Sequence, residues 1–134
     1  MATMNLTGAS FGEVVSSNDI VLVDFWASWC GPCRMFGPTF EEASERHPDA
    51  VFAKVDTEAE QELAGDLGIM SIPTLMVFRE EVLLYAQPGA LPAESLEELI
   101  QEAKELDMVD IRRQIAESQA SRDRETGGVE ERSA

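Results

Sequence analysis

The stretch VDFWASWCGPCRMFGP, residues 23–38, decides the fold, because a buried strand, a pair of cysteines and the start of a helix follow one another in it. The run IVLVDFW, residues 20–26, is rich in β-branched and aromatic residues, which is typical of a strand covered on both faces. After the cysteines, apolar residues recur at helical spacing as far as Ala43. We therefore expect a strand over 20–26 and then a helix that ends before Pro48.

Strand and helix patterns alternate along the rest of the chain. Further strands are expected at residues 4–7, 50–56, 74–78 and 82–85, and further helices after Ser10, at 60–67 and from about Pro92. The last two strands follow a very short turn and should pair as an antiparallel hairpin. This order predicts an α/β fold with a mixed sheet of about five strands and helices on both faces.

The hairpin has two unusual features. Its turn, Arg79-Glu80-Glu81, contains no residue that adopts a positive φ at low cost, so the sequence leaves the turn type open. Pro88 cannot donate a ladder hydrogen bond, and we expect it to end the edge strand early.

Composition and charge exclude several classes of function. The 134 residues suffice for one ordinary domain, and 26 acidic against 10 basic side chains give a formal net charge of -16. Such a charge repels phosphate backbones and anionic membrane surfaces, so we expect no nucleic-acid and no membrane partner. The first twenty residues lack Lys, Arg and a long apolar run, which predicts no secretory signal and a cytoplasmic location.

The chain changes character near Asp107. Residues 1–107 carry most of the negative charge and all the aromatic residues, whereas 108–134 form a polar extension. Met108, Ile111 and Ile115 lie out of phase with the apolar stripe of the preceding helix, so they predict a separate short amphipathic helix over about 108–117. From Ser118 onward the polar composition predicts a disordered tail.

The Cys30-Gly31-Pro32-Cys33 motif carries the chemistry. At the start of a helix, unpaired N–H groups and the helix dipole stabilise a thiolate on Cys30, and Pro32 suits the first helical turn. Cys33 lies one turn further on, close enough to form a disulfide or to displace a mixed disulfide. Because cytosolic thiols are kept reduced, such a pair indicates redox or metal chemistry.

The alternative interpretation of the two cysteines is half of a zinc site or a pair of buried thiols. Two Cys and one His cannot supply the four Cys/His ligands of an ordinary structural zinc site. His47 lies about four helical turns from Cys33, beyond the reach of a shared ion, and is expected to be exposed at a helix end. We therefore expect no metal.

Asp24 interrupts the apolar strand next to this motif. Burial would raise the pKa of its carboxyl group, so that it could exchange a proton near neutral pH. The alternative is a polar strand residue that is hydrogen-bonded for stability.

Together with KVD at 54–56, SIPT at 71–74 and PGA at 88–90, the opening stretch resembles the thioredoxin family over residues 5–107. The resemblance implies a central five-stranded mixed sheet flanked by four helices, to which the extension adds its short helix. It implies a monomeric protein-disulfide reductase that uses a reversible CGPC dithiol/disulfide, binds no cofactor and serves cell redox homeostasis. Its partners would be disulfide-containing client proteins and an NADPH-dependent flavoprotein, thioredoxin reductase.

The resemblance also implies roles for individual residues. Cys30 would be the attacking nucleophile, Cys33 the resolving thiol and Asp24 the group that assists deprotonation of Cys33, with Lys54 close by. Pro73 would be a cis-proline beside the disulfide. A flat rim for docking partners would consist of Trp29, Gly31, Pro32, Ile72, Pro73 and Gly89. Trp26 would pack beside the active-site loop, although it could equally be core, and Lys54 could be a plain exposed charge.

Two other classes of function stay open. The fold could serve as a docking subunit whose redox pair is incidental, or the protein could be an isomerase or oxidase with a higher redox potential. The Gly-Pro pair between the cysteines favours the reductase by family analogy.

Overall fold

The computed structural model describes residues 2–133, and the side chains of residues 2–124. Its mixed sheet has the strand order β1-β3-β2-β4-β5, in which β1, β3 and β2 are parallel and β4 and β5 are antiparallel to their neighbours. The strands are β1 (Thr3–Asn5), β2 (Ile20–Trp26), β3 (Val51–Asp56), β4 (Thr74–Arg79) and β5 (Val82–Pro88). The predicted five-stranded mixed sheet is confirmed.

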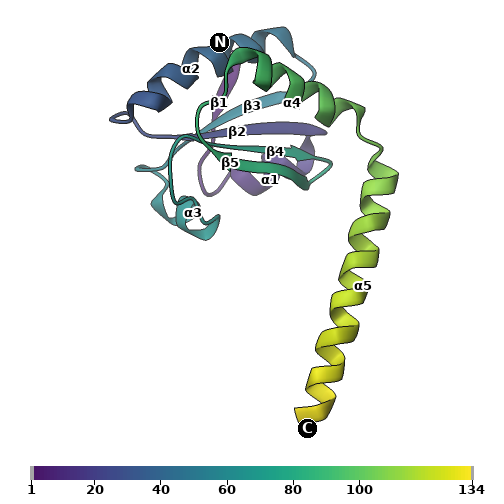
Figure 1. Ribbon diagram of the computed structural model, residues 1–134. Helices are drawn as coiled ribbons and strands as arrows, with labels where there is room; N and C mark the ends of the chain where they lie inside the picture. The colour runs from purple at the N-terminus through teal and green to yellow at the C-terminus, as the bar shows by residue number, and fades with distance from the viewer. Residues whose placement is uncertain (1, 134) are drawn as a thin grey trace. The chain divides into compact units, whose positions relative to one another are not determined.

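Helices cover both faces of this sheet, as predicted. They are α1 (Phe11–Ser17), α2 (Gly31–Arg46), α3 (Gln61–Asp66) and α4 (Ala93–Glu105). Figure 1 shows α2 and α4 on one face, and α1 and α3 on the other. The apolar core is divided accordingly, since α2 and α4 bury Phe36, Phe40 and Ile100 in one cluster while α1 contributes Val15 to the other.

Strand β2 lies in the middle of the sheet and belongs to both core clusters. Its residues alternate between the faces, with Leu22 packed in the cluster under α2 and α4, and Val23 and Phe25 in the opposite cluster. The same alternation places Asp24 on the face that α2 covers. The continuous apolar run therefore reflects two covered faces, and its one carboxyl group lies below the helix that starts at the cysteines.

The hairpin between β4 and β5 is closed by a two-residue turn. Glu80 and Glu81 both have positive φ, 49° and 71°, which is the backbone of a type I′ turn. The expectation that Pro88 ends the strand early is wrong, because Pro88 still pairs in register with Thr74. At the edge of a sheet a proline is tolerated, since its missing N–H can face away from the ladder.

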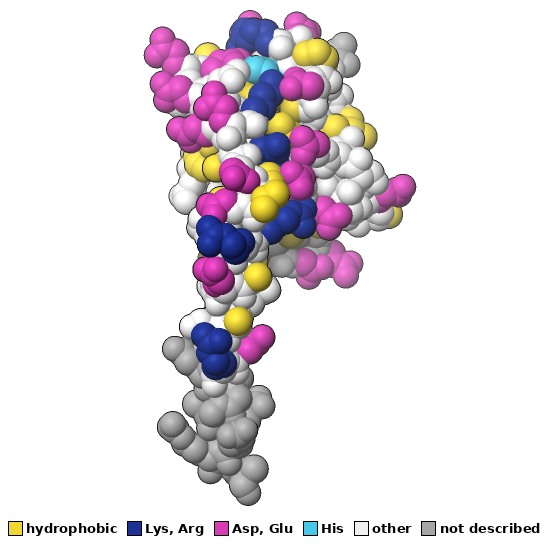
Figure 2. Space-filling model, turned by 90° about the vertical axis from the view of Figure 1, so that its right-hand side faces the viewer, with side chains coloured by type: hydrophobic (Ala, Val, Ile, Leu, Met, Phe, Trp, Pro, Cys, Tyr) yellow, Lys and Arg dark blue, Asp and Glu magenta, His cyan; other side chains and the backbone are white. Residues whose placement is uncertain are grey.

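His47 caps the C-terminal end of α2 and is buried, which corrects the predicted exposure. The Lys104 ammonium can only donate, so His47 Nδ1 accepts at 2.9 Å and Nε2 donates to Glu97 at 2.7 Å. Glu97 also pairs with Arg46, and Lys104 with Asp49. In Figure 2 the only histidine, in cyan, lies among blue and magenta side chains. These bonds replace the water that the buried ring has lost.

The second unit of the chain, residues 105–134, contains α5 (Met108–Ser133). The helix begins at the predicted residue, where the N–H of Asp110 donates to Asp107 Oδ1 at 3.2 Å. It continues to Ser133, which corrects the predicted end near residue 117 and the disordered tail after it. Its Arg, Gln, Glu and Ala residues are good helix formers, and polar composition alone does not oppose a helix. Residues 1 and 134, the outer limits of the two predicted domains, lie outside the described residues.

Candidate active site

Cys30 and Cys33 form a disulfide at the start of α2, with their Cα atoms 5.2 Å apart. Cys30 is the N-cap residue of the helix, and its Sγ accepts the backbone N–H of Cys33 at 3.2 Å. Both cysteines are nearly buried. A thiolate formed on Cys30 would therefore accept the Cys33 N–H and face the positive end of the helix dipole. Both lower the free energy of the charged form.

The Ile72–Pro73 peptide bond is cis, as the resemblance implied, and it lies beside the disulfide. The Ile72 carbonyl oxygen is 3.7 Å from Cys30 Sγ. On its other side, the Pro73 carbonyl accepts the N–H of Gly89 at 2.8 Å. Gly89 has a φ of 107°, which side-chain-bearing residues rarely adopt. The Gly89–Pro73 bond joins the end of β5 to the residue before β4, and Ile72 on the other side of Pro73 lies beside Cys30.

Asp24 is completely buried on β2, and neither of its carboxyl oxygens has a hydrogen-bond partner among the described residues. Burial raises its pKa from 3.8 to about 7, although the positive charge of Lys54 pulls the pKa downward. The group can therefore gain or lose a proton near neutral pH. No hydrogen bond among the described residues supports the alternative interpretation, in which Asp24 is a polar strand residue that is hydrogen-bonded for stability.

Lys54 is the register partner of Asp24 on the neighbouring parallel strand β3. Its Nζ lies 5.0 Å from the centre of the Trp26 ring, within the range of a cation–π interaction. Trp26 itself packs against the cluster formed by Ala27, Cys30 and Cys33. Both residues therefore lie at the site.

Below the disulfide, a cavity of about 360 Å³ opens to the surface. It is lined by Trp26, Cys33, Arg34, Gly37, Pro38, Glu41 and Lys54. Trp26 on β2 and Lys54 on β3 were predicted at the site from the sequence, whereas Glu41 was not. Its position one turn beyond Gly37 on the cysteine helix is the signal that could have found it.

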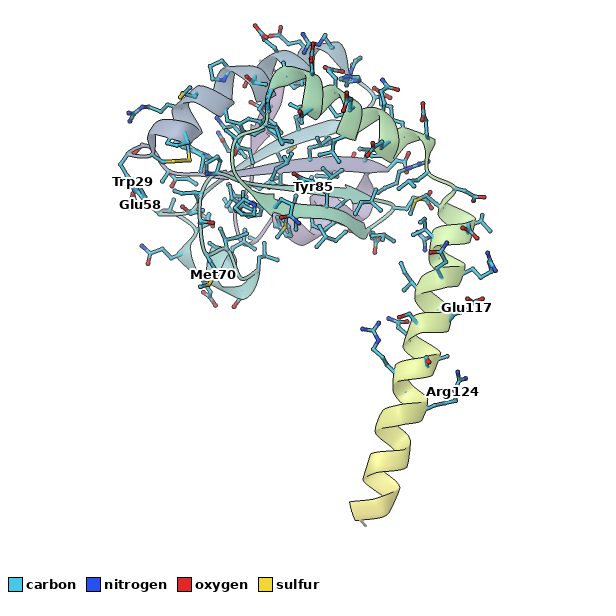
Figure 3. The ribbon with its side chains drawn as sticks, viewed as in Figure 1. Trp29, Glu58, Met70, Tyr85, Glu117 and Arg124 are labelled. Carbon is cyan, nitrogen blue, oxygen red and sulfur yellow. A yellow bond between two sulfur atoms is a disulfide. The ribbon has the colours of Figure 1, made fainter. Side chains whose placement is uncertain are left out.

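Among the residues predicted to form a docking rim, Trp29 is 66% exposed. Gly31 and Pro32 begin α2, while Ile72 packs against the cysteine cluster. Figure 3 shows the disulfide, Trp29 and Met70 at the same end of the domain in that view. Met70 is 95% exposed. It precedes the cis-proline loop, and sequence alone could not show that this apolar side chain faces solvent.

Two other kinds of site are absent from the part of the chain that the structure describes. Residues 2–133 contain no helix that is both long and apolar enough to cross a membrane. No three His, Cys, Asp or Glu side chains among the described residues come together as a potential metal site.

The thioredoxin family model matches residues 2–102. A putative thioredoxin 2 from Streptomyces coelicolor is 55% identical over 119 residues, which cover 89% of each chain. The thioredoxin of Bacillus subtilis is 42% identical over 101 residues, covering 75% of this chain and 96% of its own. Among solved structures, a mutant thioredoxin from Halobacterium salinarum superposes with a TM-score of 0.73 at 36% identity, covering 78% of this chain and 93% of its own.

Proposed function

Because the chain belongs to the thioredoxin family and is a thiol-disulfide oxidoreductase with a redox-active Cys30–Cys33 disulfide, we propose that it is a general protein-disulfide reductase. The single observation that carries this proposal is a disulfide at the N-terminus of the helix that covers the face of the sheet with the unpartnered, buried Asp24 carboxyl group. One part stabilises a thiolate, and the other can move a proton at neutral pH.

In the first step the Cys30 thiolate attacks one sulfur of a client disulfide. A mixed disulfide forms between Cys30 and the client, and the other client sulfur leaves as a thiolate. The position of Cys30 as the N-cap of α2 supports its role as the nucleophile, since the helix dipole acts most strongly there.

In the second step Cys33 attacks the sulfur of Cys30 and releases the second client thiolate. Asp24 accepts the proton of the Cys33 thiol. The two client thiolates take up two protons in all, which balance the proton from Cys33 and the proton that Cys30 released on forming its thiolate. Two electrons pass from the dithiol to the client, and the Cys30–Cys33 disulfide re-forms. The pKa of Asp24, raised to about 7 by burial, supports this role because it is matched to the working pH.

Clients would dock on the rim formed by Trp29, Gly31, Pro32, Ile72, Pro73 and Gly89. An extended client segment would pair with the backbone beside the cis-proline. Exposed apolar side chains support this docking surface. Trp29 belongs to the rim and Met70 lies just before the cis-proline loop, and both expose large apolar side chains that a partner could bury. The acidic net charge disfavours nucleic acid and membranes as alternative partners.

An NADPH-dependent thioredoxin reductase would recharge the disulfide, so the protein itself would need no bound cofactor. We place the protein in the cytoplasm as a monomer that contributes to cell redox homeostasis. Residues 1–107 would act as the thioredoxin domain and 108–134 as an extension. Truncation after Asp107 should therefore leave disulfide reduction largely intact and lower stability modestly.

Reduction of insulin by catalytic amounts of the protein, with NADPH and a thioredoxin reductase present, tests the proposal. Turnover that disappears in the Cys30→Ser, Cys33→Ser double variant is expected. A double variant that retains the biological function would favour a docking subunit. A redox potential tens of millivolts above that of thioredoxins would favour an oxidase or isomerase, since about 30 mV corresponds to 1.4 kcal/mol.

A further inference from the structure

The cavity beside Cys33 is lined by one carboxyl group, that of Glu41, which has no role in the two proposed steps. Glu41 lies on α2, and its Oε2 accepts a hydrogen bond from Thr3 Oγ1 at 2.8 Å. Its other oxygen, Oε1, is buried and has no hydrogen-bond partner among the described residues. Oε2 is therefore held by Thr3, whereas Oε1 is available to interact with a cation in the cavity.

Lys54 is the cation that the cavity offers to it. Both side chains line the same space, and Gly37 lies one helical turn before Glu41 on the same face of α2. A Cβ atom at position 37 would lie 4.0 Å from Lys54 Nζ. Because Gly37 has no side chain, nothing at this position separates the ammonium group from the next turn of the helix.

The other charged group at the cavity is differently engaged. Arg34 donates from Nη1 to the Ser28 carbonyl oxygen at 3.0 Å and is exposed. Asp24 on β2 has no hydrogen-bond partner, although Lys54 acts on it through space. The half-buried Lys54 ammonium therefore lines the same cavity as Glu41 and acts on Asp24 through space. It is hydrogen-bonded to neither oxygen of Asp24.

We propose that Glu41 is a positioning residue for the proton transfer between Asp24 and Cys33, because its carboxylate competes with Asp24 for the Lys54 ammonium. While Lys54 interacts with Glu41, the Asp24 carboxyl group holds its proton more tightly and is the stronger base when it is ionised. Without Glu41, Lys54 stabilises the Asp24 carboxylate, which then accepts the Cys33 proton less readily. This inference rests on the proposed function for its biological meaning.

Titration of the Asp24 carboxyl carbon by NMR in the oxidised protein tests the competition without any client or turnover. Glu41→Gln keeps the shape of the side chain and an oxygen for Thr3, so the fold should be retained. We expect it to lower the Asp24 titration midpoint from about pH 7 by about one pH unit. Glu42→Gln is the matched control, since it removes the same charge from the exposed neighbouring position and should move the midpoint much less.

A double-variant cycle shows whether Glu41 acts through Lys54. In a Lys54→Met background, Glu41→Gln should no longer lower the Asp24 midpoint appreciably. An equal shift in both backgrounds, or an equal shift with Glu42→Gln, would overturn the proposal, because Glu41 would then act only as one charge among many.

The pH profile of client reduction supplies a second measurement. Glu41→Gln should move the midpoint of the Cys33 resolution rate in the same direction as the Asp24 titration. If wild-type protein reduces no disulfide, the proposed function fails while the titration still decides the role of Glu41. If wild-type protein is active and Glu41→Gln leaves both the titration and the profile unchanged, only the inference about Glu41 fails.

Discussion

The two ends of α2 each bury one titratable side chain close to the helix, but they treat it in opposite ways. At the N-terminal end Asp24 has no hydrogen-bond partner on either oxygen. At the C-terminal end His47 uses both ring nitrogens, one with Glu97 and one with Lys104. A buried polar group without hydrogen-bond partners lowers the free energy of unfolding by about 1–3 kcal/mol. Asp24 therefore destabilises the fold at the disulfide end, whereas the paired His47 does not do so at the other end.

This difference separates groups that stabilise the fold from groups that are available for chemistry. The bonds of His47 hold its ring in one position and join α2 to α4. The Asp24 carboxyl group lacks such bonds, and its pKa is raised to about 7 by burial. Changes at the disulfide end should therefore alter turnover and leave or improve stability, whereas changes at the His47 end should lower stability and leave turnover intact.

The largest effect is expected from removing the resolving thiol. Cys33→Ser keeps the attack by Cys30 but cannot displace the client, so turnover should fall more than about 100-fold and a mixed disulfide should accumulate through Cys30. Mass spectrometry of trapped complexes measures the adduct. Adducts that form through Cys33 in Cys30→Ser, and not the reverse, would invert the two roles.

Asp24→Asn should separate stability from turnover. Between pH 3.8 and about 7 the folded protein holds a proton on Asp24 that the unfolded chain has lost, so this group makes stability fall as pH rises through that window. The free energy of unfolding of the variant, measured relative to wild type, should thus rise by up to about 4 kcal/mol from pH 4 to pH 8. The resolution of the mixed disulfide by Cys33 should become slower.

Denaturant unfolding of both proteins at pH 4 and pH 8, with the resolution rate measured in parallel, provides the check. A free-energy difference that is the same at both pH values, together with a wild-type exchange rate, would show that Asp24 is structural.

The disulfide end of α2 could be predicted from the sequence far better than the other end. Cys30, Asp24 and Pro73 lie where local pattern and the family resemblance placed them, because strand burial and the helix start are encoded by adjacent residues. His47 was expected to be exposed because it lies at a helix end. Its partners Glu97 and Lys104 are about fifty residues away in the chain, so no neighbouring residue indicates its burial. Pairing over such a separation depends on how α4 packs, which periodicity does not specify.

Glu41 and Met70 illustrate the same limit at the site itself. Each belongs to an element that was predicted, but the burial of one Glu41 oxygen and the exposure of Met70 are properties of the packed molecule. The length of α5 is a different case. Its polar composition argued for disorder, yet its residues favour a helix without needing a core.

A smaller effect, in the opposite direction, is expected at the His47 end. Glu97→Ala leaves the buried Nε2–H of His47 without its partner and should cost about 1–3 kcal/mol, with insulin reduction unchanged. Partial burial raises the pKa of Glu97, but hydrogen bonds from His47 and Arg46 outweigh it and leave the pKa below 4.5. The stability that Glu97 contributes should therefore disappear as pH falls through this lowered pKa.

Glu98→Ala is the control for this experiment, since it removes the same side chain from the adjacent exposed position of α4. Thermal unfolding at pH 7 should show little change for Glu98→Ala. Equal losses for the two variants would mean that the charged cluster around His47 adds nothing to the stability of the fold.

The smallest effect should come from the β4–β5 turn. There an unfavourable backbone conformation occurs in a part of the fold that belongs to neither end of α2. Glu81 holds a φ of 71°, a conformation that costs a side-chain-bearing residue about 1 kcal/mol and costs glycine little. Glu81→Gly should therefore raise the free energy of unfolding by about 0.5–1 kcal/mol and leave disulfide reduction unchanged. Glu58→Gly, which removes the same charge at an exposed residue without positive φ, should not stabilise. If Glu81→Gly instead slows client reduction, the turn contributes to activity although it does not belong to the disulfide end of α2. Functional groups would then not be confined to that end, and the contrast between the two ends would fail.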